Sequence, residues 1–147
     1  MAMELTSPAF APMQPIPREH TCEGANLSPP LNWSGVPEGT VSLLLTCDDP
    51  DAPRGVFHHW AACNIPATAT GLTAGEGAGQ AALNDFRKPG YGGPCPPPGD
   101  RPHRYVFRLV ALDTRLAPAA GARCPELAAL ARGHELARAE LIGLFGR

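Results

Sequence analysis

The stretch "FHHWAACNI", residues 57–65, decides the fold class of this 147-residue chain. Strict alternation would place Phe57, His59, Ala61, Cys63 and Ile65 on one face, and His58, Trp60, Ala62 and Asn64 on the other. Side chains that alternate in this way are typical of a β-strand, whose successive residues point to opposite faces. The neighbouring His58 and His59 are therefore expected to point in opposite directions.

Two further strands are predicted on either side of this one. In "VSLLLTC", residues 41–47, one face carries Val41, Leu43, Leu45 and Cys47, and Leu44 on the other face indicates burial on both sides. In "HRYVFRLVALD", residues 103–113, one face carries His103, Tyr105, Phe107, Leu109 and Ala111. His103 and Tyr105 are therefore expected to point the same way.

Helices are predicted only near the C-terminus. "CPELAALARG", residues 124–133, has Pro125 in a first helical turn and Gly133 as a stop signal. "HELARAELIGLF", residues 134–145, spaces Ala137, Leu141, Leu144 and Phe145 as one apolar helical face. We expect a mainly β domain, residues 1–147, with two short helices that cover the sheet.

Composition narrows the class of protein. A net charge of −2 without a basic tract argues against nucleic acid as a partner. The N-terminal prolines do not suit a signal peptide, and no window reaches the roughly 18 apolar residues of a membrane span, so a cytoplasmic protein is expected. Five cysteines without a C-x-x-C motif favour reduced thiols over a disulfide framework.

The acidic segment "DPDAP", residues 49–53, precedes the histidine strand and is typical of a turn. A buried imidazole needs a hydrogen-bond partner. Asp49 or Asp51 could accept from one ring nitrogen and leave the other for a ligand. A second segment, "GYGGPCPPPGD", residues 90–100, combines glycine and proline and is expected to form a stiff rim before His103.

Three kinds of site fit these residues. Asp49, Asp51, His59 and His103 could hold a divalent metal, although no short-spaced ligand pair lies on a helix. A histidine–aspartate pair could act as acid and base in a hydrolase, but no nucleophile is apparent, because Cys95 and the serines lack a catalytic context. The same side chains could instead bind an anion.

Three motifs resemble those of the phosphatidylethanolamine-binding protein family, in its bacterial Raf kinase inhibitor-like branch. They are "DDPDAP", "HHW" and "GYGGPCPPPGDRPHRYVFRLVALD", and the resemblance extends over almost the whole chain. It implies a Greek-key β-sandwich with a small pocket for phosphate, phosphorylated head groups or carboxylates. The implied pocket positions are Asp49, His59, Gly93, Pro94, His103 and Tyr105. Asp51 and Pro53 match a structural turn, in which the Ala52–Pro53 bond is a candidate for a cis peptide.

The resemblance also implies the kind of function. We expect a non-enzymatic binding protein without a cofactor or resident metal, in which His59 and His103 donate to the anion and Asp49 orients an imidazole. A homodimer is expected, and modulation of a kinase or protease is a further expectation, since relatives in animals and yeast act in this way. A hydrolase that uses the histidine–aspartate pair remains the alternative.

Overall fold

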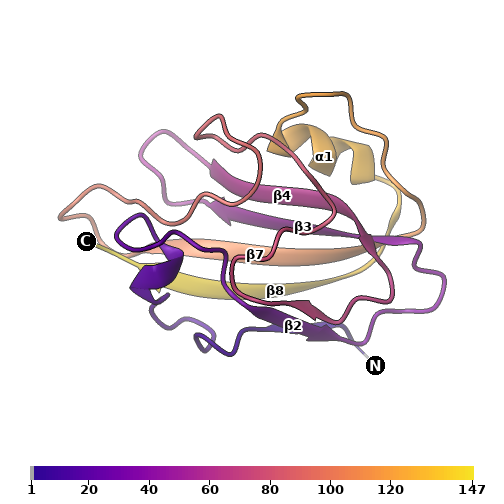
Figure 1. Ribbon diagram of the computed structural model, residues 1–147, viewed down its shortest axis with the longest axis horizontal. Helices are drawn as coiled ribbons and strands as arrows, with labels where there is room; N and C mark the ends of the chain where they lie inside the picture. The colour runs from indigo at the N-terminus through magenta and orange to yellow at the C-terminus, as the bar shows by residue number, and fades with distance from the viewer. Residues whose placement is uncertain (1) are drawn as a thin grey trace.

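Two antiparallel β-sheets packed face to face form the framework of the computed structural model, which describes residues 2–147 (Figure 1). The smaller sheet has the order β1 (Glu4–Thr6), β2 (Leu31–Ser34), β5 (Gly71–Leu72). The larger has the order β6 (Gln80–Ala81), β4 (Phe57–Pro66), β3 (Ser42–Asp49), β7 (His103–Leu112), β8 (Glu135–Phe145). The helix α1 (Cys124–Ala131) and a 3₁₀ turn (Arg18–His20) complete the elements. The predicted mainly β sandwich is confirmed.

Strand β3 lies at the centre of the larger sheet and is buried on both faces, as predicted. Leu43 and Leu45 point into the core between the sheets, which also contains Trp33 of β2. Leu44 points the other way, into a second apolar cluster that contains Leu127 of α1. The α1 helix therefore covers the outer face of the larger sheet (Figure 1), where it closes the second cluster.

A β-bulge sets the directions of the two adjacent histidines. Cys47 pairs with Trp60 and Asp48 pairs with His58, so His59 is the extra residue on β4. Bulges are frequent beside functional sites because they redirect one side chain. The His58 ring contacts Asp48, whereas the His59 ring packs against Tyr105 of the inner core.

The prediction that His58 and His59 point in opposite directions is thus confirmed. The prediction that His59 shares its face with Ala61 and Cys63 is wrong. Ala61 and Cys63 belong to the cluster under α1 rather than to the side of His59. The reason is the bulge, because the inserted residue shifts the alternation by one position. Strict alternation counted from sequence cannot include such an insertion.

The prediction of a second C-terminal helix is wrong, because residues 135–145 form β8. This strand pairs with β7 along its whole length, from Glu135 opposite Leu112 to Phe145 opposite His103. Its inward residues Ala139, Leu141 and Phe145 follow the period of a strand. Local alanine, leucine and glutamate content favours a helix, but burial against β7 outweighs this preference. The first predicted helix is confirmed as α1.

Within residues 2–147, no helix is both long and apolar enough to cross a membrane.

Candidate functional site

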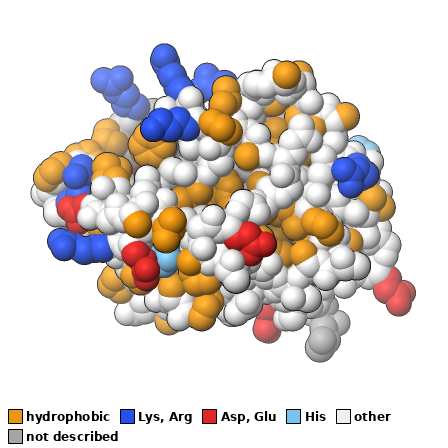
Figure 2. Space-filling model, viewed as in Figure 1, with side chains coloured by type: hydrophobic (Ala, Val, Ile, Leu, Met, Phe, Trp, Pro, Cys, Tyr) orange, Lys and Arg blue, Asp and Glu red, His pale blue; other side chains and the backbone are white. Residues whose placement is uncertain are grey.

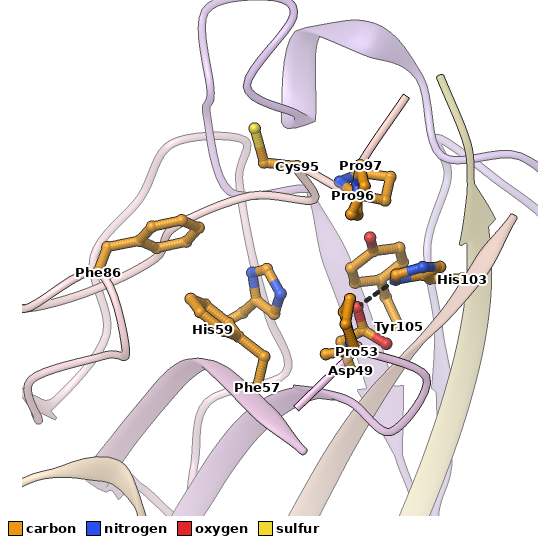
Figure 3. A pocket seen from close by; sticks show the side chains of 11 residues that line it. Asp49, Pro53, Phe57, His59, Phe86, Cys95, Pro96, Pro97, His103 and Tyr105 are labelled. Atoms are coloured by element: carbon orange, nitrogen blue, oxygen red, sulfur yellow. Dashed lines mark hydrogen bonds and ion pairs between the residues drawn. The ribbon is translucent and has the colours of Figure 1, made fainter. Parts of the chain in front are cut away.

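A pocket of about 220 Å³ opens at one end of the sandwich, where the loop after β3, the start of β7 and the glycine- and proline-rich segment meet (Figure 3). Its lining residues are Asp49, Ala52, Pro53, Phe57, His59, Phe86, Cys95, Pro96, Pro97, His103 and Tyr105. The fold therefore brings together Asp49, Pro53, His59, His103 and Tyr105, which are separated by up to 56 positions in the chain, from residue 49 to residue 105.

Asp49 and His103 form a buried pair in this pocket. The Asp49 Oδ2 atom lies 2.7 Å from His103 Nδ1, and its Oδ1 atom accepts a hydrogen bond from the Asp51 backbone N–H at 2.8 Å. His103 Nε2 lies 3.1 Å from Asp100 Oδ2. Because a carboxylate oxygen accepts hydrogen bonds, these contacts favour a proton on both nitrogens of His103. Burial alone would lower the pKa of His103, but the bonds to Asp49 and Asp100 outweigh it and raise this pKa.

The pKa of His59 is shifted in the opposite direction to that of His103. Its Nδ1 atom donates to the Gly92 carbonyl oxygen at 2.6 Å, which leaves Nε2 as an acceptor in the neutral ring. Burial is the main cause that lowers the pKa of His59. The ring packs against the aromatic rings of Phe57, Phe86 and Tyr105. His59 is therefore held neutral in an apolar surrounding.

Tyr105 presents an unpaired hydroxyl in the pocket. The side chain is fully buried, and within residues 2–147 its Oη atom is the one buried side-chain nitrogen or oxygen without a hydrogen-bond partner. Burial, followed by the nearby charge of Asp49, raises the pKa of this phenol, so the hydroxyl keeps its proton. An unpaired buried hydroxyl is costly and rare, which makes this atom a candidate donor to a ligand.

Gly93 and Pro94 lie behind the pocket wall rather than on it. The Gly93 N–H donates to Asn26 Oδ1 at 2.9 Å, and the Pro94 carbonyl oxygen accepts from the Cys22 N–H at 3.1 Å. A Cβ atom at Gly93 would collide with Asn26 and with the backbone of His20. These two residues position the segment, whereas the following residues of the same segment, Cys95 to Pro97, line the cavity.

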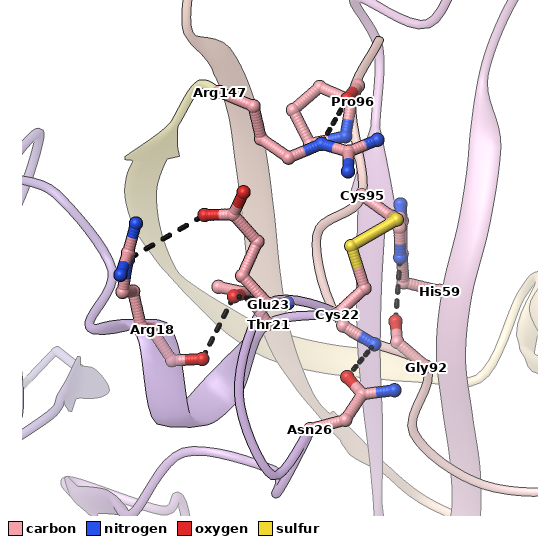
Figure 4. The surroundings of a disulfide bond; sticks show 11 residues. Arg18, Thr21, Cys22, Glu23, Asn26, His59, Gly92, Cys95, Pro96 and Arg147 are labelled. Atoms are coloured by element: carbon pink, nitrogen blue, oxygen red, sulfur yellow. Dashed lines mark hydrogen bonds and ion pairs between the residues drawn. A yellow bond between two sulfur atoms is a disulfide. The ribbon is translucent and has the colours of Figure 1, made fainter. Parts of the chain in front are cut away.

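A disulfide joins Cys22 to Cys95 at the edge of the pocket (Figure 4), and the prediction of reduced thiols is wrong for this pair. The two residues are 73 positions apart, so no short cysteine-spacing motif in the sequence indicates this bond. Folding brings the loop after the 3₁₀ turn against the glycine- and proline-rich segment, which places the sulfurs together. Cys47 and Cys63 are free and buried, as predicted, and Cys124 is free and buried as well.

The sequence profile of the phosphatidylethanolamine-binding protein family matches residues 6–146. The chain belongs to this family. It is 48% identical over 153 residues to a UPF0098 protein of Methanothermobacter thermautotrophicus, with 99% of each chain covered. It is 42% identical over 154 residues to a UPF0098 protein of Aquifex aeolicus, with 99% of this chain and 89% of the relative covered.

Two solved structures of relatives share the architecture. A phosphatidylethanolamine-binding protein homologue of Chlamydia trachomatis superposes with a TM-score of 0.93 at 38% identity, over 99% of this chain and 98% of the other. Escherichia coli YbcL, described as a member of the mammalian family, superposes with a TM-score of 0.93 at 35% identity, over 100% and 99% of the two chains. Both comparisons support the family fold around the pocket.

The turn expected from the family resemblance is present, but without the expected cis bond. Asp51 leaves the pocket and pairs with Arg104, which donates to it from the backbone N–H at 2.9 Å and from the guanidinium at 2.8 and 2.9 Å. The hydrogen bonds from the Arg104 side chain are the main cause that lowers the pKa of Asp51 to about 2. Every peptide bond that the structure describes is trans, so the Ala52–Pro53 prediction is wrong.

The four acids and histidines considered as metal ligands do not converge. Asp51 turns to Arg104, and the His59 Nδ1 atom donates to a carbonyl. Among residues 2–147, no group of three or more His, Cys, Asp or Glu side chains is placed to hold a metal ion.

Sequence reasoning missed several residues of this family pocket. Phe86, Pro96 and Pro97 line the cavity, and Asp100 contacts His103. The stiff composition of "GYGGPCPPPGD" did predict a rim, but it could not say which of its residues face inward. Phe86 lies in a loop without periodicity, so no pattern in the sequence indicates its role.

Proposed function

We propose that this member of the family is a non-enzymatic binding protein whose pocket takes phosphate, a phosphorylated head group or a carboxylate. The observation that carries the proposal is the Tyr105 hydroxyl, which is buried, protonated and without a partner inside a lined cavity. An anionic oxygen is the natural acceptor for such a donor, because hydrogen bonds to charged groups are the stronger ones.

The charges around the cavity support an anion. Despite burial, the bonds to two carboxylates raise the pKa of His103 and so favour its charged form. One imidazolium about 4 Å from an anion contributes about 4 kcal/mol of Coulomb energy at an effective dielectric of 20, before desolvation. Arg54, Arg87 and Lys88 are exposed and directly follow the lining residues Pro53 and Phe86. Figure 2 shows that basic side chains gather at the upper left of the molecule, over the loops beside β4. Such charges draw anions toward a site.

His59 adds a preference for ligands that carry a proton. In its neutral form the Nε2 atom accepts, so it suits a hydrogen phosphate, whose P–OH group donates. When pH falls through the lowered pKa of His59, the ring becomes a second charged donor. Affinity for anions should therefore rise toward acidic pH. A cavity of about 220 Å³ fits a small group of this kind better than a whole cofactor.

The acid–base enzyme is supported less well by the same residues. Both ring nitrogens of His103 are already bonded to carboxylates, and the Cys95 sulfur at the pocket edge is in a disulfide. Serine, threonine and lysine do not occur among the residues that line the cavity. Homodimer formation and modulation of a kinase or protease are further parts of the proposal, which rest on the family resemblance. A cytoplasmic location is a further part, which rests on the sequence alone.

A titration with inorganic phosphate, followed through the histidine ring signals by NMR, tests the proposal. We expect saturable shifts at His59 and His103, and a loss of affinity of about tenfold in Tyr105→Phe, which removes one donor to a charged ligand. Tyr91→Phe is the matched control, since its hydroxyl donates to the His20 carbonyl oxygen outside the pocket. Phosphorylethanolamine and acetate are then compared with phosphate.

Two results would count against the anion pocket. The first is the absence of saturation in the wild-type protein and in both variants. The second is an equal response of Tyr105→Phe and wild type to phosphate. A turnover screen with phosphate esters and carboxylic esters tests the enzyme alternative. Turnover by the wild-type protein that is lost in His103→Ala would support that alternative.

A further inference from the structure

The outer nitrogen of His103 is occupied by a side chain of the protein itself. His103 Nε2 lies 3.1 Å from Asp100 Oδ2, while Nδ1 is bonded to the buried Asp49. The two carboxylates differ in exposure: the Asp49 side chain is 4% exposed, whereas that of Asp100 is 42% exposed. His103 therefore has one permanent partner and one that solvent can reach.

The pairing leaves His103 without a free N–H group. With both ring protons engaged, the Tyr105 hydroxyl is the remaining donor of the polar trio formed by His59, His103 and Tyr105. A ligand oxygen that bonds His103 has to take the place of an Asp100 oxygen. We propose that Asp100 is a resident competitor, which sets the affinity and the charge selectivity of the pocket because it must turn away before an anion reaches His103. This inference rests on the proposed anion-binding function.

The surroundings of Asp100 contain basic side chains that could accept the displaced carboxylate. Asp100 also borders a second hollow of about 590 Å³, which is lined by Arg18 and Arg147 among others. Arg18 is largely exposed, with a long ion pair of 3.6 Å to Glu23. A carboxylate that leaves His103 can therefore turn toward basic side chains, which reduces the free energy needed for the exchange.

The chain around Asp100 is suited to such a movement. Asp100 closes a turn through one backbone bond of 3.3 Å to the Pro97 carbonyl oxygen, and Gly99 has a φ of 88°, in the left-handed region that favours glycine. Pro97 belongs to both the turn and the pocket wall. The turn that carries Asp100 is thus continuous with the rim of the cavity.

Charge selectivity follows from electrostatics. A carboxylate at the pocket edge repels an anion in proportion to the charge of that anion. Its removal should tighten the binding of every anion that contacts His103, because the competitor is gone. The gain should be larger for sulfate, which carries two charges, than for acetate, which carries one.

The test compares Asp100→Ala and Asp100→Asn with Asp113→Ala. Asp113 is an exposed aspartate that contacts His134 at 2.8 Å, so its removal deletes the same charge from another Asp–His pair. Affinities for inorganic phosphate, sulfate and acetate are measured by calorimetry at about pH 6, below the ordinary pKa of histidine, where Asp49 still favours the charged His103 ring in every variant.

We expect Asp100→Ala to bind phosphate at least fivefold more tightly than wild type, with a larger gain for sulfate than for acetate. The phosphate affinity of Asp100→Asn should lie between those of wild type and Asp100→Ala, since its amide oxygen still accepts from Nε2. The affinity of Asp113→Ala should match that of wild type. Wild-type protein that binds phosphate while Asp100→Ala binds it equally or more weakly would overturn the competitor role and leave the anion pocket standing. Absence of binding in all four proteins would overturn both, whereas binding by Asp100→Ala alone would support the competitor role and count against phosphate as a ligand of the wild-type protein.

Discussion

His59 and His103 lie on opposite sides of the Tyr105 ring and are stabilised in opposite charge states (Figure 3). The His59 ring meets Tyr105 edge-on, with centroids 5.3 Å apart, and the His103 ring stacks on it at 6.5 Å. One imidazole is surrounded by aromatic rings and a carbonyl, the other by two carboxylates. The pocket thus combines a neutral acceptor, a phenol donor and a cation within one small space.

The two rings should therefore titrate on opposite sides of the ordinary histidine pKa of about 6.5. A raised pKa means that His103 stabilises the fold fully below pH 6.5 and loses this contribution as pH rises through its folded-state pKa. A lowered pKa means that His59 stabilises the fold above pH 6.5 and loses this contribution as pH falls. NMR titration of both rings in the ligand-free protein measures the two values.

Asp49→Asn supplies the control for that titration. It removes the buried one of the two charged partners of His103, so the His103 pKa should fall, while the main cause at His59, burial, is retained. Rings that both titrate near 6.5 in the wild-type protein would contradict the assignment of opposite charge states.

Tyr105→Phe should leave stability unchanged or raise it slightly. The hydroxyl is buried and makes no hydrogen bond within the described residues, so its removal abolishes no bond in the ligand-free protein and relieves a desolvation cost. Urea unfolding at neutral pH gives the free energies of unfolding. A stabilising or neutral effect combined with weaker phosphate binding would separate a ligand donor from a structural hydroxyl.

Tyr91→Phe should show the reverse pattern. Its hydroxyl donates to the His20 carbonyl oxygen at 2.7 Å, and loss of this bond should lower the free energy of unfolding by about 1 kcal/mol. Phosphate affinity should stay close to that of wild type. Equal destabilisation by the two substitutions would mean that the Tyr105 hydroxyl has a partner after all.

The sequence predicted the parts of the site that depend on strand alternation. His103 and Tyr105 share a face because they are two positions apart on β7, and β7 is a regular strand at that end. The opposition of His58 and His59 also follows from their adjacency. Their surroundings could not be predicted in the same way, because the bulge at His59 depends on how β4 pairs with β3.

Features that depend on distant contacts were predicted wrongly or missed. The helical composition of residues 134–145 gave no sign that β7 would take this segment as its edge partner. The bond between Cys22 and Cys95 requires two loops to meet, which no spacing encodes. Asp100 had no predicted role, and only the folded chain places its carboxylate on the imidazole of His103.

Gly93→Ala should destabilise the protein by about 1–3 kcal/mol, the usual cost of forcing an extra carbon into a tightly packed position. The new Cβ atom would collide with Asn26 and with the His20 backbone, and the shift would pass to the adjacent Gly92 carbonyl that holds His59. Urea unfolding and the His59 ring signal report the two effects. Gly77→Ala is the control, because a Cβ atom there meets nothing within 4 Å; equal stability of the two variants would refute the packing role of Gly93.

The Cys22–Cys95 disulfide should contribute about 2–5 kcal/mol to stability, because it closes a long loop between positions 73 residues apart. The variant Cys22→Ser/Cys95→Ser and the reduced wild-type protein should therefore unfold at similar, lower urea concentrations. Three hydrogen bonds still join the same two segments, from Tyr91 to His20, from Gly93 to Asn26 and from Cys22 to Pro94. These bonds should keep the folded state intact after reduction.

The same variant should bind phosphate more weakly, because Cys95 lines the cavity and precedes the two prolines of its wall. Without the sulfur bridge the wall samples more positions, and ordering it on binding costs conformational entropy. Calorimetry with and without reductant distinguishes this effect from a direct action of the reductant, since the serine variant has no bridge to break. A wild-type affinity that is the same in oxidised and reduced protein would show that the hydrogen bonds alone hold the rim, and that the disulfide acts on stability without shaping the pocket.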